Sequence, residues 1–293
     1  MELEALTEIP DLPTPPKRVV SLVPSITESL FVLGFGETVV GITDYCIYPQ
    51  GQLNHLLRLG GTKNPDVEKV VALQPDLVFM DKDENMRATA EELLEAGVRI
   101  WVSFPHTVDA GLDLLRDLLA IYHTDRAAMQ VATLQAALDW AKRAAESQEP
   151  KRFFCPIWAD ETDGVQWWMT ANEDTYLSDL LTTLGGINIF AERQRSYPLS
   201  ADMGLTEAED PGERDTRFPR VILEEILAAE PEIIFLPSEP FAFDLAHKRA
   251  YMQSMSTTPA AKHNRMYLVD GSLLAWPGAR LAKALNELPR FFE

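Results

Sequence analysis

Short, mostly apolar runs alternate with amphipathic stretches in the first part of the chain. Apolar runs bounded by Pro, Gly or polar residues indicate buried strands, and apolar residues three or four positions apart indicate helices. The expected strands are 19–23, 39–42, 77–80 and 98–102, and the expected helices are 25–33, 66–73 and 86–95. This alternation predicts a mostly parallel sheet with helices on both of its faces.

The middle of the chain has a different pattern. Residues 108–149 contain no strand signal and no proline, and residues 125–148 are rich in alanine and leucine. They predict one long helix of about 36 Å, at 1.5 Å per residue. A helix of that length is long enough to cross between two lobes.

Strand and helix signals resume after the long helix. The expected strands are 152–155, 233–236 and 266–269, and the expected helices are 175–184, 221–229 and 277–288. Ser200–Arg217 is polar and acidic, which predicts a mobile surface loop.

Local signals place the ends of some of these helices. Ser25 followed by Glu28 has the spacing of a capping box, and Gly34 is suited to closing the same helix. Pro277 is expected in the first turn of the last helix, where its missing N–H has no cost.

An internal repeat indicates that the two halves have a common origin. Residues 67–80 align without gaps to residues 223–236, and each segment reads as a short helix, a proline and a buried strand. The shared glutamate, proline and acidic positions favour duplication over a generic helix–strand pattern.

Composition excludes some classes of function. The formal net charge is −19, from 26 basic and 45 acidic residues, and no basic cluster stands out. Such a surface repels nucleic acid and anionic lipid. No apolar stretch approaches the roughly 20 residues of a membrane span. Cys46 and Cys155 are expected to be reduced thiols without zinc-type spacing.

Enzyme motifs do not appear in the chain. It has no Gly-x-Ser-x-Gly elbow, no phosphate-binding Gly-x-x-x-x-Gly-Lys-Ser/Thr loop and no dinucleotide-binding glycine fingerprint. Asp83 and Glu84 are adjacent, and adjacent carboxylates rarely converge on one bond. These absences argue against the commonest enzyme classes, and an enzyme acting on a small molecule is kept as the rival class of function.

The first residues bear on location. The start is acidic and soon followed by four prolines, whereas a secretory signal needs a basic start and an apolar run. A cytoplasmic location is favoured, with a periplasmic or cell-surface location if a signal was removed.

Several segments together resemble cobalamin- and ferric-siderophore-binding proteins, the helical-backbone metal receptors with a class III periplasmic-binding-protein fold. The matching segments are 16–28, 34–36, 40–46, 60–65, 68, 74–78, 174–176, 185–188 and 269–271. Residues 45–49, 83–86 and 168–172 resemble a cobalamin-binding-protein-like branch whose members often lack a signal peptide.

The resemblance implies an α/β fold of two Rossmann-like lobes, joined by one long interdomain helix, with a ligand cleft between the lobes. We expect an N-terminal extension over 1–16 and an N-terminal α/β lobe over 17–107. A helical linker over 108–149 and a C-terminal α/β lobe over 150–293 follow.

Candidate ligand-binding residues of the first lobe follow strand ends, where ligands of parallel α/β lobes bind. Pro24 and Ser25 open a helix whose amides can face a polar group, with a plain capping serine as the alternative. Tyrosines suit a large planar ligand. The loop after the expected strand 39–42 supplies Asp44, Tyr45, Cys46 and Tyr48.

In the second lobe, three tryptophans lie within eleven positions, and the resemblance favours Trp158 and Trp168 over Trp167 as walls for a planar chelate. Trp276 and Arg280 follow the last strand. Arg280 is expected either to hold an anionic group of the ligand or to pair with a nearby acid.

Two further pairs carry weaker hypotheses. His106 and His247 are candidates for an axial metal ligand, although five dispersed histidines do not establish a metal site. Glu68 and Glu224 occupy matching positions of the repeat. In importer-type relatives, one glutamate per lobe docks onto the membrane permease, while exposed helix glutamates are the alternative.

The sequence thus predicts non-catalytic binding of a metal-containing chelate, with a corrinoid such as cobalamin as the leading ligand. A ferric siderophore or haem is the alternative. The protein is expected to have no intrinsic cofactor, to be a monomer without membrane insertion, and to act with an ABC importer permease or as a cytoplasmic derivative.

Overall fold

A computed structural model describes residues 6–293, so the first five residues of the expected N-terminal extension lie outside the described part. The chain divides into two compact units. Unit 1 contains the chain up to Ala136 together with Trp276–Ala282, and unit 2 contains Ala137–Ala275 and Lys283–Glu293. This division differs from the expected lobe boundaries mainly because residues 276–282 pack with unit 1.

Unit 1 is built on a five-stranded parallel sheet of order β3-β2-β1-β4-β5. Its strands are β1 (Val19–Ser21), β2 (Val39–Ile42), β3 (Leu57–Arg58), β4 (Leu77–Asp81) and β5 (Ile100–Ser103). Four of the five strands were expected. The two-residue β3 was missed because it is very short and Arg58 interrupts the leucines around it.

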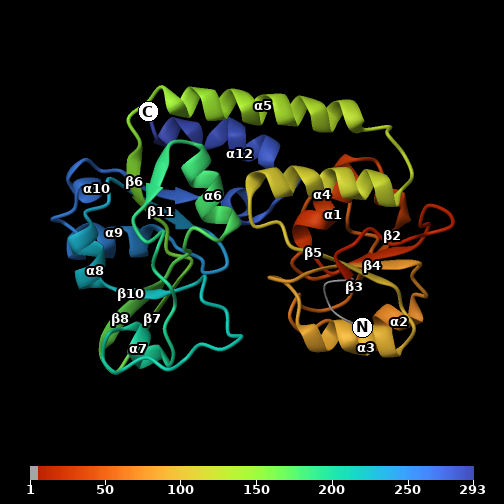
Figure 1. The fold of residues 1–293 in the computed structure, drawn as a ribbon, viewed down its shortest axis with the longest axis horizontal. Helices are drawn as coiled ribbons and strands as arrows, with labels where there is room; N and C mark the ends of the chain where they lie inside the picture. Colours follow the sequence, from red (N-terminus) through yellow and green to blue (C-terminus); the bar gives the residue numbers. More distant parts are fainter. Residues whose placement is uncertain (1–5) are drawn as a thin grey trace. The chain divides into compact units, whose positions relative to one another are not determined.

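Helices cover both faces of this sheet (Figure 1). They are α1 (Pro24–Val32), α2 (Val67–Ala72), α3 (Arg87–Glu95) and α4 (Val108–Ile121), with a 3-10 turn η2 (Gly36–Thr38). Alternate strand residues such as Val20 and Val78 join a buried cluster with Val70 of α2 and Leu93 of α3. A sheet buried on both faces explains why its strands are continuous apolar runs.

Unit 2 contains a second parallel sheet, of order β12-β11-β6-β9. Its strands are β6 (Lys151–Phe154), β9 (Gly186–Asn188), β11 (Ile233–Pro237) and β12 (Met266–Val269). The helical elements are α6 (Tyr176–Thr183), α7 (Leu199–Asp202), α8 (Leu223–Ala229), α9 (Leu245–Ser254), α10 (Pro259–Lys262), α11 (Ser272–Ala275) and η3 (Pro289–Phe291). Helix α12 (Leu281–Glu287) begins in unit 1 and continues in unit 2.

Unit 2 also carries a small antiparallel sheet of order β10-β8-β7, which the sequence analysis missed. It contains β7 (Trp158–Thr162), β8 (Val165–Met169) and β10 (Arg220–Ile222). Asp163 and Gly164 form the turn between β7 and β8, with φ values of 53° and 79°. An Asp-Gly pair with two positive φ values is the signature of a two-residue hairpin turn.

Helix α5 (Ala128–Glu146) is 19 residues long and confirms the helix expected over 125–148. The division between the two units falls inside it, after Ala136. The expected fold class, two α/β lobes joined by one long helix, is therefore confirmed in its elements and connectivity (Figure 1).

Two expected helix starts were wrong. Helix α1 begins one residue before Ser25, with Val23 as N-cap and no side-chain cap, so the expected capping box does not form. Ser25 instead accepts a hydrogen bond on its carbonyl from Ser29 Oγ at 2.8 Å. The last helix begins at Leu281 rather than Pro277, because Gly278 has a φ of 91° and interrupts the helix.

The internal repeat extends to individual hydrogen bonds. The backbone N–H of Asp76 donates to Arg18 O, and the matching N–H of Glu232 donates to Arg152 O. Each side-chain carboxylate also accepts a hydrogen bond from the same partner residue. Asp76 accepts from Arg18 N at 2.9 Å, and Glu232 accepts from Arg152 N at 3.0 Å. The same acidic position thus ties the start of β4 to β1 and the start of β11 to β6, which supports duplication.

A buried polar cluster joins the carboxyl ends of β4 and β5. Asp81 accepts hydrogen bonds from Ser103 Oγ at 2.6 Å and from Asp83 N at 2.8 Å. Asn85 accepts from the backbone N–H of Asp81 and donates its side-chain amide to two loop carbonyls. Burial, aided by neighbouring acidic charges, raises the pKa of Asp81 to about 7.

The residues that precede the equivalent prolines of the internal repeat, Gln74 and Glu230, allow a test of backbone strain. Gln74 and Glu230 have φ values of 48° and 46°, which glycine adopts without the steric cost that other residues carry. We expect Gln74→Gly and Glu230→Gly each to raise the free energy of unfolding by about 1 kcal/mol. Ala228→Gly, within regular helix α8, should lower it by a similar amount. Equilibrium urea denaturation measures all three, and destabilisation by both loop variants would contradict the expectation.

The Asp81 carboxyl should make stability depend on pH. Because its folded pKa is raised from 3.8 to about 7, the folded protein favours the neutral form. Its contribution to stability is complete below about pH 4 and is lost as pH rises to about 7. We expect the free energy of unfolding, relative to that of Asp81→Asn, to fall across this window and then level off. Denaturant titrations at a series of pH values measure this difference, and a flat difference would show that Asp81 does not titrate there.

Candidate functional site

The predicted residues of unit 1 do follow the carboxyl ends of neighbouring strands. Pro24 and Ser25 come after β1, and Asp44, Tyr45 and Tyr48 come after β2, which pairs with β1 in parallel. Pro24 and Ser25 are buried in the first turn of α1, with Ser25 only 7% exposed. The loop after β2 is therefore the part of this edge that presents side chains outward.

Cys46 does not present its thiol to a ligand, which corrects the sequence hypothesis. Its side chain is fully buried, and Sγ lies 3.1 Å from Thr27 Oγ1 and 3.2 Å from Thr43 Oγ1. Burial raises the pKa of the Cys46 thiol, so the reactive thiolate is disfavoured. The residue holds the loop onto α1.

The buried Cys46 leaves Tyr45 facing outward. Arg58 of β3 donates to the carbonyls of Thr43 and Cys46 at 2.8 and 2.9 Å, which fixes the backbone on both sides of the tyrosine. Tyr45 is 63% exposed, and its ring lies beside Gly61. A rigid loop that holds an exposed phenol ring is suited to contact with a flat apolar ligand.

Arg280 is paired with an acid inside unit 1, the second of the two alternatives considered. Its Nε donates to Glu28 Oε2 at 2.8 Å, and its guanidinium lies 3.7 Å from the ring centroid of Tyr48. Trp276 packs edge-on against Tyr48, with ring centroids 5.7 Å apart. Arg280 and Trp276 are only 4% and 5% exposed. These contacts pack the two residues inside unit 1, while Arg280 Nη2 is buried without a hydrogen-bond partner, so their contact with ligand stays a prediction.

The outward face of the small antiparallel sheet in unit 2 carries an exposed indole. Trp158 and Arg220 both pair with Met169, from opposite sides of β8, so the three residues form one row across the sheet. Residues that face each other across paired strands share one face of the sheet. Trp158 is 39% exposed, and this row is the candidate ligand surface of unit 2.

Trp168 lies on the other face, which corrects its assignment as a ligand wall. Side chains alternate along a strand, so Trp168 points opposite to Met169. It is fully buried in a cluster that includes Val221, Phe154 and Tyr251, with its ring 5.4 Å from that of Tyr251. Trp168 stabilises the core beneath the surface that Trp158 exposes.

Further aromatic rings pack beside Trp158, and of these Phe243 is itself buried in the core of unit 2. Phe241 lies edge-on to Trp158 with ring centroids 5.5 Å apart, and Phe243 and His247 lie 4.7 and 5.3 Å from Phe241. Sequence reasoning missed Phe241, Phe243 and Met169 as a group. The Asp163-Gly164 hairpin signal would have placed Met169 opposite Trp158, but nothing local to Phe241 signals its contact.

The two candidate metal-binding histidines have local partners. His247 Nδ1 lies 2.7 Å from Asp244 Oδ1 at the start of α9, and His106 Nδ1 lies 3.3 Å from Phe104 O. Within residues 6–293, no group of three or more His, Cys, Asp or Glu side chains converges to hold a metal ion. The axial-ligand hypothesis for each histidine stays a prediction.

Glu68 and Glu224 are exposed at equivalent helix positions. Each is the second residue of its helix, Glu68 in α2 and Glu224 in α8. The matching exposure is compatible with docking and also with ordinary solvated glutamates, so the docking role stays a prediction.

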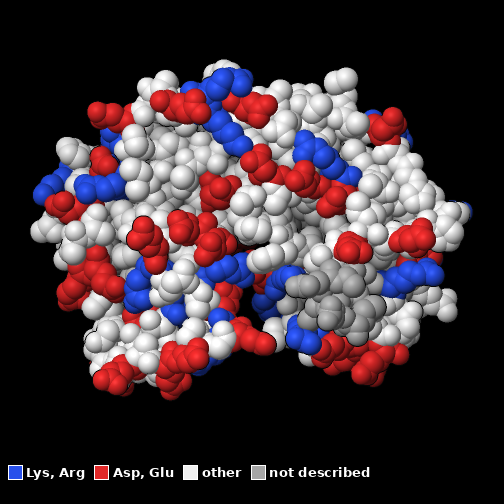
Figure 2. Space-filling model, viewed as in Figure 1, with Lys and Arg blue, Asp and Glu red and all other residues white. Residues whose placement is uncertain are grey.

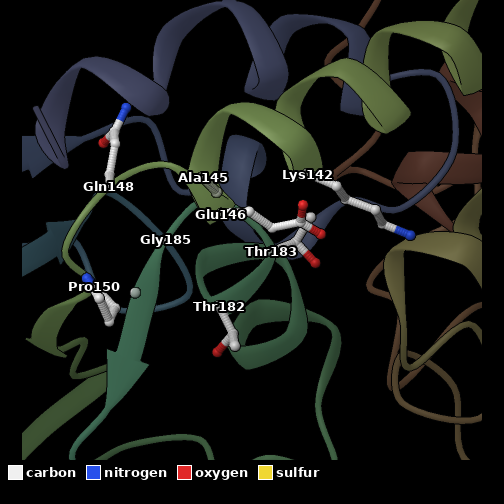
Figure 3. A pocket seen from close by; sticks show the side chains of 9 residues that line it. Lys142, Ala145, Glu146, Gln148, Pro150, Thr182, Thr183 and Gly185 are labelled. Carbon is white, nitrogen blue, oxygen red and sulfur yellow. The ribbon is translucent and has the colours of Figure 1, made fainter.

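A surface groove of unit 2 lies away from these residues. It has a volume of about 480 Å³ and is lined in unit 2 by the end of α5, the end of α6 and the start of β9 (Figure 3). Pro150 and Gly186 place it at the amino ends of β6 and β9, whereas ligands of parallel sheets bind at the carboxyl ends. A second hollow of about 310 Å³ in unit 1 is lined by residues 101–105 and by α4. None of the predicted ligand-binding residues lines either hollow.

Acidic side chains are spread over the visible face of the protein, in keeping with its net charge of −19 (Figure 2). None of the helices in the described part of the chain has the length and apolar composition to cross a membrane.

Curated relatives align with most of the chain. The vitamin B12-binding protein of Vibrio cholerae is 24% identical over 283 residues, covering 94% of this chain and 89% of the relative. The vitamin B12-binding protein of Yersinia pestis is 29% identical over 186 residues, covering 62% of this chain and 63% of the relative.

Solved structures share the fold. The periplasmic vitamin B12-binding protein BtuF of Vibrio cholerae matches with a TM-score of 0.75 and 21% identity, covering 96% of this chain and 98% of that chain. The periplasmic heme-binding protein RhuT from Roseiflexus sp. RS-1 matches with a TM-score of 0.74 and 24% identity, covering 94% and 97%. The family model for periplasmic binding proteins matches residues 19–273. The chain therefore belongs to the periplasmic binding protein family.

Proposed function

We propose that this protein binds a planar, metal-containing chelate without transforming it chemically. The observation that carries the proposal is the outward row of Trp158, Met169 and Arg220 on the small sheet of unit 2. An exposed indole beside a flexible thioether offers a flat, adaptable apolar surface, which is the surface that a macrocycle needs. The exposed ring of Tyr45 is a surface of the same kind on unit 1.

A corrinoid is the leading ligand. The relatives that align with most of this chain are vitamin B12-binding proteins, which supports cobalamin over other chelates. Haem is the second candidate, because several proteins of the same fold are described as heme-binding. A ferric siderophore stays the third.

We propose a binding role rather than catalysis, in accord with the family, and an ABC importer permease as the partner. The monomeric state and the cytoplasmic location expected from the sequence stay predictions. Cell fractionation with an antibody against the protein tests the location directly.

Ligand titration tests the proposed function. We expect cobalamin to quench the tryptophan fluorescence of the protein in a saturable way, and Trp158→Ala to weaken the affinity about tenfold or more, as loss of a buried aromatic contact does. Cobinamide, haem and ferric chelates are titrated in the same way to rank the ligand classes.

Trp140 provides a matched control for this titration. It is 67% exposed on α5, so Trp140→Ala removes an exposed indole without touching the small sheet. Its affinity should equal that of the unaltered protein. Equal affinities for all three proteins would remove Trp158 from the site, and no saturable quenching by any chelate would overturn the proposed function.

The docking role of Glu68 and Glu224 has its own test. We expect the protein, directed to the periplasm, to restore vitamin B12-dependent growth of a Vibrio cholerae strain that lacks its own vitamin B12-binding protein. Charge reversal of both residues to lysine should abolish growth without changing chelate affinity, because docking and ligand binding use different surfaces. Reversal of Glu92, an exposed glutamate of α3, should leave growth intact. Growth that survives the double reversal would refute docking through these glutamates.

A further inference from the structure

Five arginines gather in unit 2 between positions 193 and 220, although the sequence shows no basic run there. They are Arg193, Arg195, Arg214, Arg217 and Arg220. Six acidic residues are interleaved with them in the same segment, which hides the cluster from a composition scan. In Figure 2, basic side chains gather over the region where Figure 1 places β10, on a molecule whose net charge is −19.

Three of the five arginines are held by carboxylates of the same segment or of α8. Arg193 contacts Asp202 and Glu225, each at 3.3 Å. Arg217 pairs with Asp215 at 2.8 Å, and Arg214 lies 3.7 Å from Glu209. These ion pairs stabilise the loop, and none of them involves Arg195 or Arg220.

Arg195 and Arg220 differ from the other three. Among the described residues, no carboxylate lies within ion-pair distance of Arg195, and the Nε atoms of both arginines are buried without a hydrogen-bond acceptor. Arg220 reaches Asp202 only at 4.0 Å, and the same carboxylate already accepts from the backbone N–H groups of Ser196 and Arg220.

The two guanidiniums also act on each other. Burial and the nearby positive charge of Arg195 lower the pKa of Arg220, while Asp202 acts in the opposite direction. Asp215 is close enough that Arg195 contributes to lowering its pKa, although that carboxylate is bonded to Arg217. Two like charges with unmatched donors are costly to hold together, and an oxyanion between them would relieve both the repulsion and the missing acceptors.

Aromatic rings position the two arginines beside the ligand surface. The ring of Tyr197 lies between two guanidiniums, that of Arg195 at 4.3 Å and that of Arg214 at 4.1 Å. Arg220 lies 5.8 Å from the ring centroid of Trp167 and stands in the same row as Met169 and Trp158. Arg220 therefore stands on the same face of the small sheet as the exposed indole, with Met169 between them, and Arg195 lies near Arg220.

We propose that Arg195 and Arg220 receive an oxyanion, a carboxylate or a phosphate, carried on a side arm of the chelate that rests on Trp158. This inference rests on the proposed function and narrows it to chelates that combine a flat apolar face with an anionic arm. Guanidinium groups suit both oxyanions, because their planar donors match two oxygens at once.

Paired ligands that differ only in the arm test the proposal. Haem is compared with its dimethyl ester, and cobalamin with cobinamide, which lacks the phosphate-linked nucleotide. We expect Arg195→Gln to weaken binding of the arm-bearing member of at least one pair about tenfold, as loss of a charge-assisted hydrogen bond does. Binding of the matching arm-free ligand should change less than about twofold. Arg220→Gln should give the same pattern.

Arg249→Gln is the matched control, because Arg249 is exposed on α9 and its loss changes the net charge equally. Equal effects of Arg195→Gln and Arg249→Gln, or equal losses for both members of every pair, would overturn the proposal. Thermal unfolding of each variant separates loss of binding from loss of folding. Arg195→Gln is the primary variant because that residue makes no ion pair within residues 6–293.

A final measurement separates this inference from the proposed function. Inorganic phosphate and citrate are titrated into the unaltered protein and Arg195→Gln by calorimetry. If the protein binds an oxyanion in a way that needs Arg195 but binds no chelate, the anion site is supported and the proposed chelate-binding function is rejected. Chelate binding that is indifferent to both arginines would reject the anion site alone, and absence of both kinds of binding would reject the two together.

Discussion

An acidic residue just before an interior strand of each parallel sheet fixes the framework of both units. Asp76 and Glu232 each bond the backbone of the adjacent strand through both their own N–H and their carboxylate. Parallel strands must enter the sheet in a defined register, and this two-way contact sets that register at the amino ends. The exposed tyrosine lies beyond the carboxyl end of β2, and the exposed tryptophan begins β7, which follows β6.

At each candidate surface, a buried residue lies next to a residue that faces outward. Trp168 is buried while Met169, next to it, lies in the row that contains exposed Trp158. Cys46 is buried while Tyr45 is exposed. In each case the buried neighbour anchors the backbone that carries or pairs with the exposed ring. Rigid anchoring of this kind lowers the conformational entropy that binding would otherwise cost.

Most parallel strands and the long helix were predictable from the sequence, because runs such as Leu77–Met80 and Met266–Val269 are apolar and bounded by breakers. The site was less predictable. Residue type alone cannot tell which of two adjacent tryptophans faces the core, since that depends on the register of the β7–β8 hairpin. Arg280 was equally ambiguous, because its partner Glu28 lies 252 positions away in the sequence. Arg195 and Arg220 were hidden by the acids between them.

The close packing of Gly278 on α1 has a consequence for synthesis of the chain. A side chain at this glycine would meet Ser29 Oγ at 2.6 Å, and the next residue donates its N–H to the same hydroxyl at 3.1 Å. Unit 1 thus includes a segment that the ribosome adds only after most of unit 2. The N-terminal lobe stays incomplete while the C-terminal lobe is made, and nascent chains arrested before residue 276 carry an uncovered α1 that chaperones are suited to protect.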